Sequence, residues 1–174
     1  MKQKIMLDSN LFINNNTFDQ LKECINNIKD KYHLILTPYQ VYKEVKAGKE
    51  KDQRTEEKMN FCKQYFEITY DINIFPTFFG IKFCTNEQLN IYRQLLYRTL
   101  NGTIEKNQEV INNYLNNYVK DEKYDRKQRD VRIGSIAFFE NSTLITNDKS
   151  FQKRLSDLNI KNQSFDEFWI HLFQ

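Results

Sequence analysis

Two aspartates come directly after short apolar runs of the sequence. Asp8 follows residues 4–7, and Asp148 comes just after residues 143–146. Short apolar runs that end in polar residues are typical of buried strands. In an open α/β sheet, the carboxyl ends of parallel strands face the crevice where ligands bind. We therefore expect Asp8 and Asp148 to lie close together in such a crevice.

Two further acids are expected to approach this place from helices. Glu44 lies on a predicted helix that follows the second predicted strand. Asp130 precedes Ile133 and Ala137 by one and two helical turns, so the three share one stripe of a helix. If that stripe packs on the sheet, Asp130 points along the sheet toward its end. Asp130 also belongs to a run of charged residues, in which Asp121 or Asp125 could take its place.

A cluster of these carboxylates would need a compensating charge. Two like charges about 5 Å apart repel by roughly 3 kcal/mol at an effective dielectric constant near 20. Either some of the acids are protonated or a cation binds. An all-oxygen site without His or Cys favours Mg²⁺ or Mn²⁺. Such an ion can activate water and stabilise the attacking and leaving oxygens of a phosphodiester, so no side-chain nucleophile is needed.

Each acid also has an ordinary structural explanation. Asp8 could be a turn residue or could cap a helix, and Asp148 could cap the helix that follows it. Glu44 and Asp130 could be solvated residues on helix surfaces. The joint pattern, rather than any one acid, favours a functional site.

The elements that must position these acids alternate between strands and helices. Buried strands are expected at residues 4–7, 33–36 and 143–146, with a short last strand at 159–161. Capping-box patterns predict helix starts at Thr17, Thr37 and Thr85. Further helices are expected at residues 49–67, 103–120, 124–140, 150–158 and 165–172, and four residues of the 124–140 helix should face a core: Val131, Ile133, Ile136 and Ala137.

This alternation predicts an α/β fold with a mostly parallel sheet covered by helices on both faces. The 174 residues fit one domain, 1–174, with residues 68–123 as a helical elaboration. The stretch from 68 to 81 is β-rich and aromatic, and its structure is the least defined by the sequence. No apolar stretch approaches the roughly 20 residues of a membrane span.

The ordered set of motifs resembles the PIN-domain ribonucleases, the family that includes the VapC-type toxins. Their first motif is an apolar strand followed by Asp, a small hydroxyl residue and Asn, which Asp8-Ser9-Asn10 matches. Their second is an acid on the helix after strand two, here Glu44. Their third is Asp with small and apolar residues at helical spacing, here from Asp130. Their fourth is a strand that ends in Thr, often Asn, and then Asp, here Thr146-Asn147-Asp148.

The resemblance covers about residues 1–67 and 124–174 and implies a three-layer PIN-like fold. It implies Mg²⁺- or Mn²⁺-dependent hydrolysis of RNA, either single-stranded or structured. Asp8, Glu44, Asp130 and Asp148 would be the catalytic metal ligands. A supporting set would hold them by hydrogen bonds: Ser9, Asn10, Thr146 and Asn147. Many family members are toxins that pair with an antitoxin protein and are often dimeric, so an antitoxin and a second copy of the chain are the implied protein partners.

Basic and aromatic residues near Asp130 are candidates for substrate contacts. A nuclease needs cations to meet phosphates, and the segment around Asp130 supplies Lys123, Arg126, Lys127, Arg129 and Arg132. The alternative for these side chains is a plain solvated face. Five tyrosines could stack on bases, although their helical spacing favours the core: Tyr92, Tyr97, Tyr114, Tyr118 and Tyr124. The net charge of +3 permits nucleic-acid binding without requiring it.

Two other functions stay open at this level. A phosphatase with an aspartyl nucleophile usually has a second Asp two residues after the first, but Asn10 stands there. A catalytically degenerate PIN-like module that binds RNA or a protein is the non-enzymatic alternative. The three cysteines form no metal-ligand pattern or disulfide framework, so we expect a reducing cytoplasm.

Overall fold

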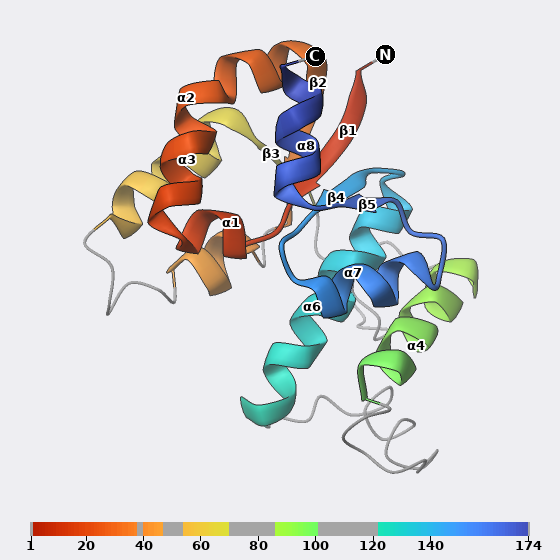
Figure 1. Ribbon diagram of the computed structural model, residues 1–174. Coiled ribbons are helices and arrows are strands. Elements are labelled where there is room, and N and C mark those ends of the chain that lie inside the picture. The colour runs from red at the N-terminus through yellow and green to blue at the C-terminus, as the bar shows by residue number, and fades with distance from the viewer. Residues whose placement is uncertain (1, 38–39, 47–53, 70–85, 101–121, 174) are drawn as a thin grey trace.

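The computed structural model describes residues 2–37, 40–46, 54–69, 86–100 and 122–173 (Figure 1). Within these residues, five parallel strands form one sheet in the order β3-β2-β1-β4-β5. The strands are β1 (Gln3–Leu7), β2 (Tyr32–Leu36), β3 (Glu67–Ile68), β4 (Thr143–Ile145) and β5 (Asn162–Gln163). The α/β class and the parallel sheet predicted from the sequence are confirmed.

The strand order reverses at the centre of the sheet. The chain leaves β1 toward β2 and β3 on one side, and later returns to β4 and β5 on the other side of β1. The carboxyl ends of β1 and β4 are therefore neighbours, with Leu7 in register with Ile145. A reversal of this kind opens the crevice in which open α/β sheets bind ligands.

Helices cover both faces of this sheet, as Figure 1 shows. One face packs against α1 (Asn10–Ile13), α2 (Asn15–Lys31), α3 (Thr55–Tyr65) and α8 (Phe165–Leu172). The other face packs against α4 (Asn86–Leu100), α6 (Glu122–Phe139) and α7 (Lys149–Ser156). Alternation along the strands explains the two cores, because Ile5 and Leu7 enter the first while Met6 enters the second. None of the described helices combines the length and the hydropathy needed to cross a membrane.

The capping box predicted at Thr37 is present. The Gln40 amide nitrogen donates to Thr37 Oγ1 at 3.1 Å, and the Thr37 amide nitrogen donates to Gln40 Oε1 at 2.9 Å. The element that follows is η1 (Gln40–Val45), a π-helix rather than the expected α-helix. Val41 and Val45 are buried in the first core, so the wider turn still keeps both on the sheet-facing side.

Two of the predicted boundaries are wrong. The helix expected to begin at Thr17 begins at Asn15, because the side chain of Asn14 caps it by accepting from the amide nitrogens of Asn16 and Thr17. The last strand comes after residues 159–161 rather than within them. Asn159 has a left-handed backbone (φ 56°), and the Ile160 amide nitrogen bonds back to Leu155, which closes α7 before the strand can start.

The long helix before β4 agrees with its sequence pattern. The four residues predicted to face a core are all at most 1% exposed: Val131, Ile133, Ile136 and Ala137. Gly134 lies among them, where a Cβ atom would come within 2.9 Å of Leu155 Cδ2 and 3.3 Å of Leu95 Cδ1. The missing side chain therefore lets α6 approach α7 and α4 closely. Thr85 and the helix predicted at 103–120 lie outside the described residues.

Candidate metal centre

Asp8 is held at the carboxyl end of the central strand. Its amide nitrogen continues the β1–β4 ladder by donating to the Ile145 carbonyl at 2.9 Å. Only 8% of the residue is exposed. A carboxylate buried to this extent requires polar partners, because removal of an unpaired charge from water is costly.

Thr146 supplies the main partner and links three residues of the site. Its buried Oγ1 donates to Asp8 Oδ2 at 2.6 Å. The same oxygen accepts from Asn10 Nδ2 at 3.3 Å and from the Asp148 amide nitrogen at 3.2 Å. Ser9 Oγ donates to the other Asp8 oxygen, Oδ1, at 3.3 Å. The structure thus brings Ser9, Asn10 and Thr146 to Asp8.

The surroundings of the Asp8 carboxyl favour its neutral form more than water does. Burial raises its pKa above the ordinary value, and the hydrogen bonds from Thr146 and Ser9 lower the pKa without restoring that value. The negative charge of Asp148 adds to the increase, so the two carboxylates lie near enough to repel each other. A cation bound between them would relieve both the desolvation and the repulsion.

Asp148 is both a member of this site and the N-cap of α7. Its Oδ1 accepts from the Phe151 amide nitrogen at 3.0 Å and from Ser150 Oγ at 2.8 Å. Partial burial raises the pKa of Asp148, but these hydrogen bonds and the charge of Arg154 outweigh that effect and lower it overall. Among the described residues, its Oδ2 has no hydrogen bond. One oxygen of Asp148 therefore caps the helix and the other is available to a ligand.

Asp130 lies on α6 and is paired with a residue that the sequence analysis did not single out. Arg154 Nη2, on α7, donates to Asp130 Oδ2 at 2.8 Å. The side chain of Arg154 is 20% exposed and that of Asp130 is 33% exposed. In the sequence, the one indication of this pairing is that Arg154 lies on the helix that begins just after Asp148. That indication is weak because the chain has many other basic residues.

Two of the predicted site residues, Asn147 and Glu44, do not reach Asp8 as expected or cannot be placed, and neither can the alternatives to Asp130. Asn147 Oδ1 accepts from the Phe165 amide nitrogen at 3.1 Å, so its side chain holds the start of α8 instead. The Glu44 backbone lies in η1, but its side chain is outside the described part of the structure. Asp121 is also outside, as is the side chain of Asp125.

Gln40 holds the end of β1 in place, whereas the sequence indicates only its part in the capping box with Thr37. Its Nε2 donates to the Leu7 carbonyl at 2.6 Å, and the whole residue is buried. It therefore attaches η1 to the last residue of β1, directly before Asp8. Gln152 acts similarly on the other strand, because its Nε2 donates to the Thr146 carbonyl at 3.0 Å.

The predicted substrate-binding residues are only partly described. The side chains of Lys123, Arg126 and Lys127 lie outside the described residues. Arg129 and Arg132 are half-buried, and the Nε atom of each is buried. Of the tyrosines, Tyr92 is buried in the second core and Tyr97 is 44% exposed, whereas the side chains of Tyr114, Tyr118 and Tyr124 are not described.

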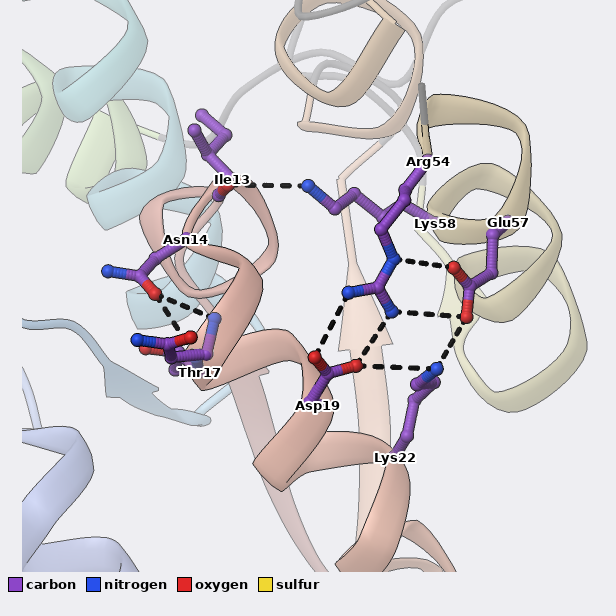
Figure 2. A network of polar contacts seen from close by, with 9 residues as sticks. Ile13, Asn14, Thr17, Asp19, Lys22, Arg54, Glu57 and Lys58 are labelled. Atoms are coloured by element: carbon purple, nitrogen blue, oxygen red, sulfur yellow. Dashed lines mark hydrogen bonds and ion pairs between the residues drawn. The ribbon is translucent and has the colours of Figure 1, made fainter. Parts of the chain in front are cut away.

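A network of ion pairs and hydrogen bonds joins the helices that follow the motif Asp8-Ser9-Asn10 (Figure 2). Arg54 Nη1 and Nη2 donate to Asp19 on α2 at 3.0 and 2.7 Å, and its Nε donates to Glu57 on α3 at 2.8 Å. Lys22 joins the same two carboxylates. Lys58 is almost fully buried and donates to the Ile13 carbonyl at the end of α1. These contacts hold α3 against α1 and α2. They thereby fix the position of α1, the helix that begins at Asn10.

The oxygen atoms around Asp8 suit a hard divalent cation. Among the described residues, no group of three or more His, Cys, Asp or Glu side chains is arranged to hold a metal ion. Asp148 is near enough to Asp8 for its charge to raise the Asp8 pKa. Asn10, which donates to Thr146, has a buried Oδ1 without a hydrogen-bond partner among the described residues. Buried polar atoms are rarely left unsatisfied, so this oxygen marks a place for a cation or water. Carboxylate and amide oxygens are ligands that Mg²⁺ and Mn²⁺ accept.

The strand order, the two helical layers and the acids at the reversal point define a PIN-like α/β fold. No protein-family model matches the sequence, and no curated protein matches it. Among solved structures, the chain is similar to the crystal structure of VapBC2 from Rickettsia felis bound to a DNA fragment from their promoter. The TM-score is 0.53 and the identity 15%, over 94% of this chain and 100% of the other. At this identity the similarity concerns the fold alone.

Proposed function

We propose that the protein is a divalent-metal-dependent endoribonuclease that hydrolyses RNA phosphodiester bonds. The observation that carries this proposal is the hydroxyl of Thr146, which donates to the Asp8 carboxylate and accepts from the backbone of Asp148 and the side chain of Asn10. The Asn10 Oδ1 atom is buried and has no partner among the described residues. These residues lie at the point where the strand order reverses, in a fold similar to that of VapBC2. Mg²⁺ or Mn²⁺ is the proposed cofactor.

The ligands proposed for the ion are Asp8, Asp148 and Asn10, with Asp130 and Glu44 as further acids. When bound, such an ion supplies an activated water and stabilises the leaving oxygen of a phosphodiester. The protein's own contribution is orientation. Thr146 fixes one oxygen of Asp8, and the α7 cap fixes one oxygen of Asp148, so each carboxylate presents its other oxygen in a set direction.

The decisive experiment is cleavage of single-stranded RNA by the full-length protein with Mn²⁺, analysed on a denaturing gel. We expect cleavage that EDTA abolishes and that Asp8→Asn and Asp148→Asn each reduce at least about a hundredfold, as loss of a charged group that acts in the transition state does. Mn²⁺ binding measured by calorimetry should weaken in the same variants. Cleavage that persists in EDTA or in both variants would contradict the proposal.

The choice of variant at position 148 matters, because Asp148 also caps a helix. Asparagine caps helices about as well as aspartate, whereas alanine costs about 1 kcal/mol of stability. Asp148→Asn therefore removes the charge and keeps the fold. Asp148→Ala serves as the comparison: if the two variants differ in unfolding but agree in lost cleavage, the loss is chemical rather than structural.

A non-catalytic RNA-binding module is the second candidate. The ion pair between Asp130 and Arg154 favours it, because that pair neutralises an acid that a nuclease would use for metal. RNA binding without cleavage in Mn²⁺, measured by fluorescence anisotropy, would support this candidate. Release of phosphate from small phosphomonoesters would instead support a phosphatase, although Asn10 cannot serve as the second acid of such an enzyme.

The partners proposed for the protein follow from the structural neighbour. VapBC2 was crystallised with a promoter DNA fragment. We propose by analogy that this chain is the toxin of a toxin–antitoxin pair and forms a homodimer. Induced expression should then arrest growth of a bacterial host, while the Asp8→Asn variant should not. Light scattering of the purified protein tests the dimer separately.

A further inference from the structure

Arg154 is placed among the acids of the candidate metal centre. Its Nη2 donates to Asp130 Oδ2 at 2.8 Å. Its charge also lowers the pKa of Asp148, so the guanidinium lies within electrostatic range of two proposed ligands on different elements. Since the Asp130–Arg154 pair is partly buried, salt screens it less than a fully exposed pair.

The remaining contacts of Arg154 are weak, which leaves the guanidinium incompletely bound. Its Nη1 meets Ser150 Oγ only at 3.3 Å, and its carbon centre lies 5.4 Å from the Phe151 ring centroid. Its Nε is buried and, within the described residues, has no hydrogen-bond partner. An arginine prefers to use its donors in a bidentate pair. This one uses a single strong hydrogen bond, so its release from Asp130 breaks little else.

We propose that Arg154 is the resident counter-cation of Asp130 and Asp148, and that a divalent ion must displace it from Asp130 to bind. This inference rests on the proposed metal site and concerns how that site is controlled. Without metal, Arg154 offsets the repulsion among the acids and keeps Asp130 turned toward α7. With metal, the same charge opposes the ion. Arg154 therefore lowers the affinity for metal while it stabilises the metal-free protein.

The packing of Gly134 against side chains of α7 lies next to the pair. Gly134, one turn after Asp130, lies against Leu155, which directly follows Arg154. The absence of a side chain at Gly134 brings the two helices together at this level. Arg98 provides a natural comparison, because it forms a similar 3.0 Å pair with Asp157 at the end of α7, where it is more exposed and belongs to no acid cluster.

The test is the Mn²⁺ affinity of the full-length protein, measured by calorimetry and by electron paramagnetic resonance of free Mn²⁺. We expect Arg154→Gln to bind Mn²⁺ roughly tenfold more tightly than the wild type, because loss of a hydrogen bond to a charged group is of that order. Arg154→Lys, which keeps the charge, should stay near the wild type. Arg98→Gln should bind as the wild type does. The melting temperature without metal should fall in Arg154→Gln, and Mn²⁺ should raise it by more than in the wild type.

Each outcome decides the inference. If the wild type binds Mn²⁺ and Arg154→Gln binds it equally tightly or more weakly, the role proposed for Arg154 is overturned. The proposed metal site is unaffected by that result. Absence of Mn²⁺ binding in the wild type and in Arg154→Gln overturns both proposals. Should Arg154→Gln fail to fold, Arg154→Met keeps the apolar stem over Phe151 and carries the same expectation of tighter binding.

Discussion

The buried hydroxyl of Thr146 donates to Asp8 across 2.6 Å, and this bond joins the carboxyl ends of β4 and β1. It is the shortest of the three hydrogen bonds made by that oxygen, and it satisfies an oxygen of a carboxylate that is almost fully removed from water. The bond thus stabilises the fold and also partly offsets the burial of the Asp8 charge. The first two predictions test these two effects separately.

Replacement of Thr146 by valine keeps the shape of the side chain and removes the hydroxyl. We expect the free energy of unfolding at neutral pH to fall by about 2 kcal/mol, because a buried group loses a hydrogen bond to a charge. Urea denaturation measures the change. Thr143→Val is the matched control at the start of β4, since within the described part of the chain Thr143 Oγ1 has only a 3.1 Å bond from Gln3 Nε2. Equal losses in the two variants would show that the bond to Asp8 has no special weight.

Asp8 is expected to reduce the stability of the metal-free protein as the pH rises. Because burial raises the pKa of Asp8 in the folded state above its ordinary value, the folded protein holds this proton more tightly than the unfolded chain does. Stability is therefore lost as the pH rises through the folded pKa. Asp8→Asn should unfold at a higher urea concentration than the wild type at pH 7 without metal, with the difference shrinking below about pH 4. A variant that is less stable than the wild type at pH 7 would contradict this.

Gly134 should tolerate only the smallest side chain. A Cβ atom at this position meets the end of the Leu155 side chain at 2.9 Å, so Gly134→Ala requires a small shift of a buried leucine. The gain in helix propensity, about 1 kcal/mol, offsets much of that cost. Gly134→Val adds two methyl groups and should lower the free energy of unfolding by about 2–3 kcal/mol through overpacking. Thermal melts of the two variants test the order, and a neutral valine variant would show that α6 and α7 can separate freely.

The ion-pair network on α2 and α3 should protect the fold down to unusually low pH. The guanidinium of Arg54 lowers the pKa of Asp19 and of Glu57 to about 2. Both acids stay charged in the folded protein below the pH at which the unfolded chain takes up protons. Their contribution is therefore present above about pH 4 and lost between about pH 4 and 2.

Arg54→Gln should thus be less stable than the wild type at pH 7, and the difference should shrink steadily as the pH falls toward 2. Molar salt should shrink the difference at pH 7, because the pairs lie at the surface. Acid denaturation followed by circular dichroism measures both effects. The conservative Arg54→Lys keeps the charge but not the forked geometry that spans Asp19 and Glu57, and should fall between the two.

The sequence predicts what depends on local pattern. Apolar runs locate β1, β2 and β4, helical spacing identifies the buried stripe from Val131 to Ala137, and Thr37 and Gln40 form the predicted capping box. The pattern is less informative where two residues of similar type compete. Asn14 and Thr17 can both accept hydrogen bonds from a backbone at a helix start, and in the structure Asn14 is the residue that caps α2.

In the site too, the positions of residues along the chain can be predicted from local sequence, whereas their tertiary partners cannot. The positions of Asp8, Thr146 and Asp148 after their strands follow from apolar runs alone. The partners of Asn147 and Asp130 do not, because Phe165 and Arg154 are brought to them by the packing of α8 and α7. Nothing in the local sequence around Arg154 distinguishes it from the neighbouring Lys153. The side chain of Glu44 lies outside the described residues, so its role stays a prediction.

The reversal of strand order at β1 has a consequence for synthesis of the chain. Asp8 and Thr146 are 138 positions apart, so the ribosome makes β1, β2 and β3 long before β4. Chains fold from the N-terminal side as they emerge. A nascent chain interrupted before residue 143 would carry Asp8 without Thr146 or Asp148. The site is therefore completed late, and incomplete translation products would lack it even where their first strands had already paired.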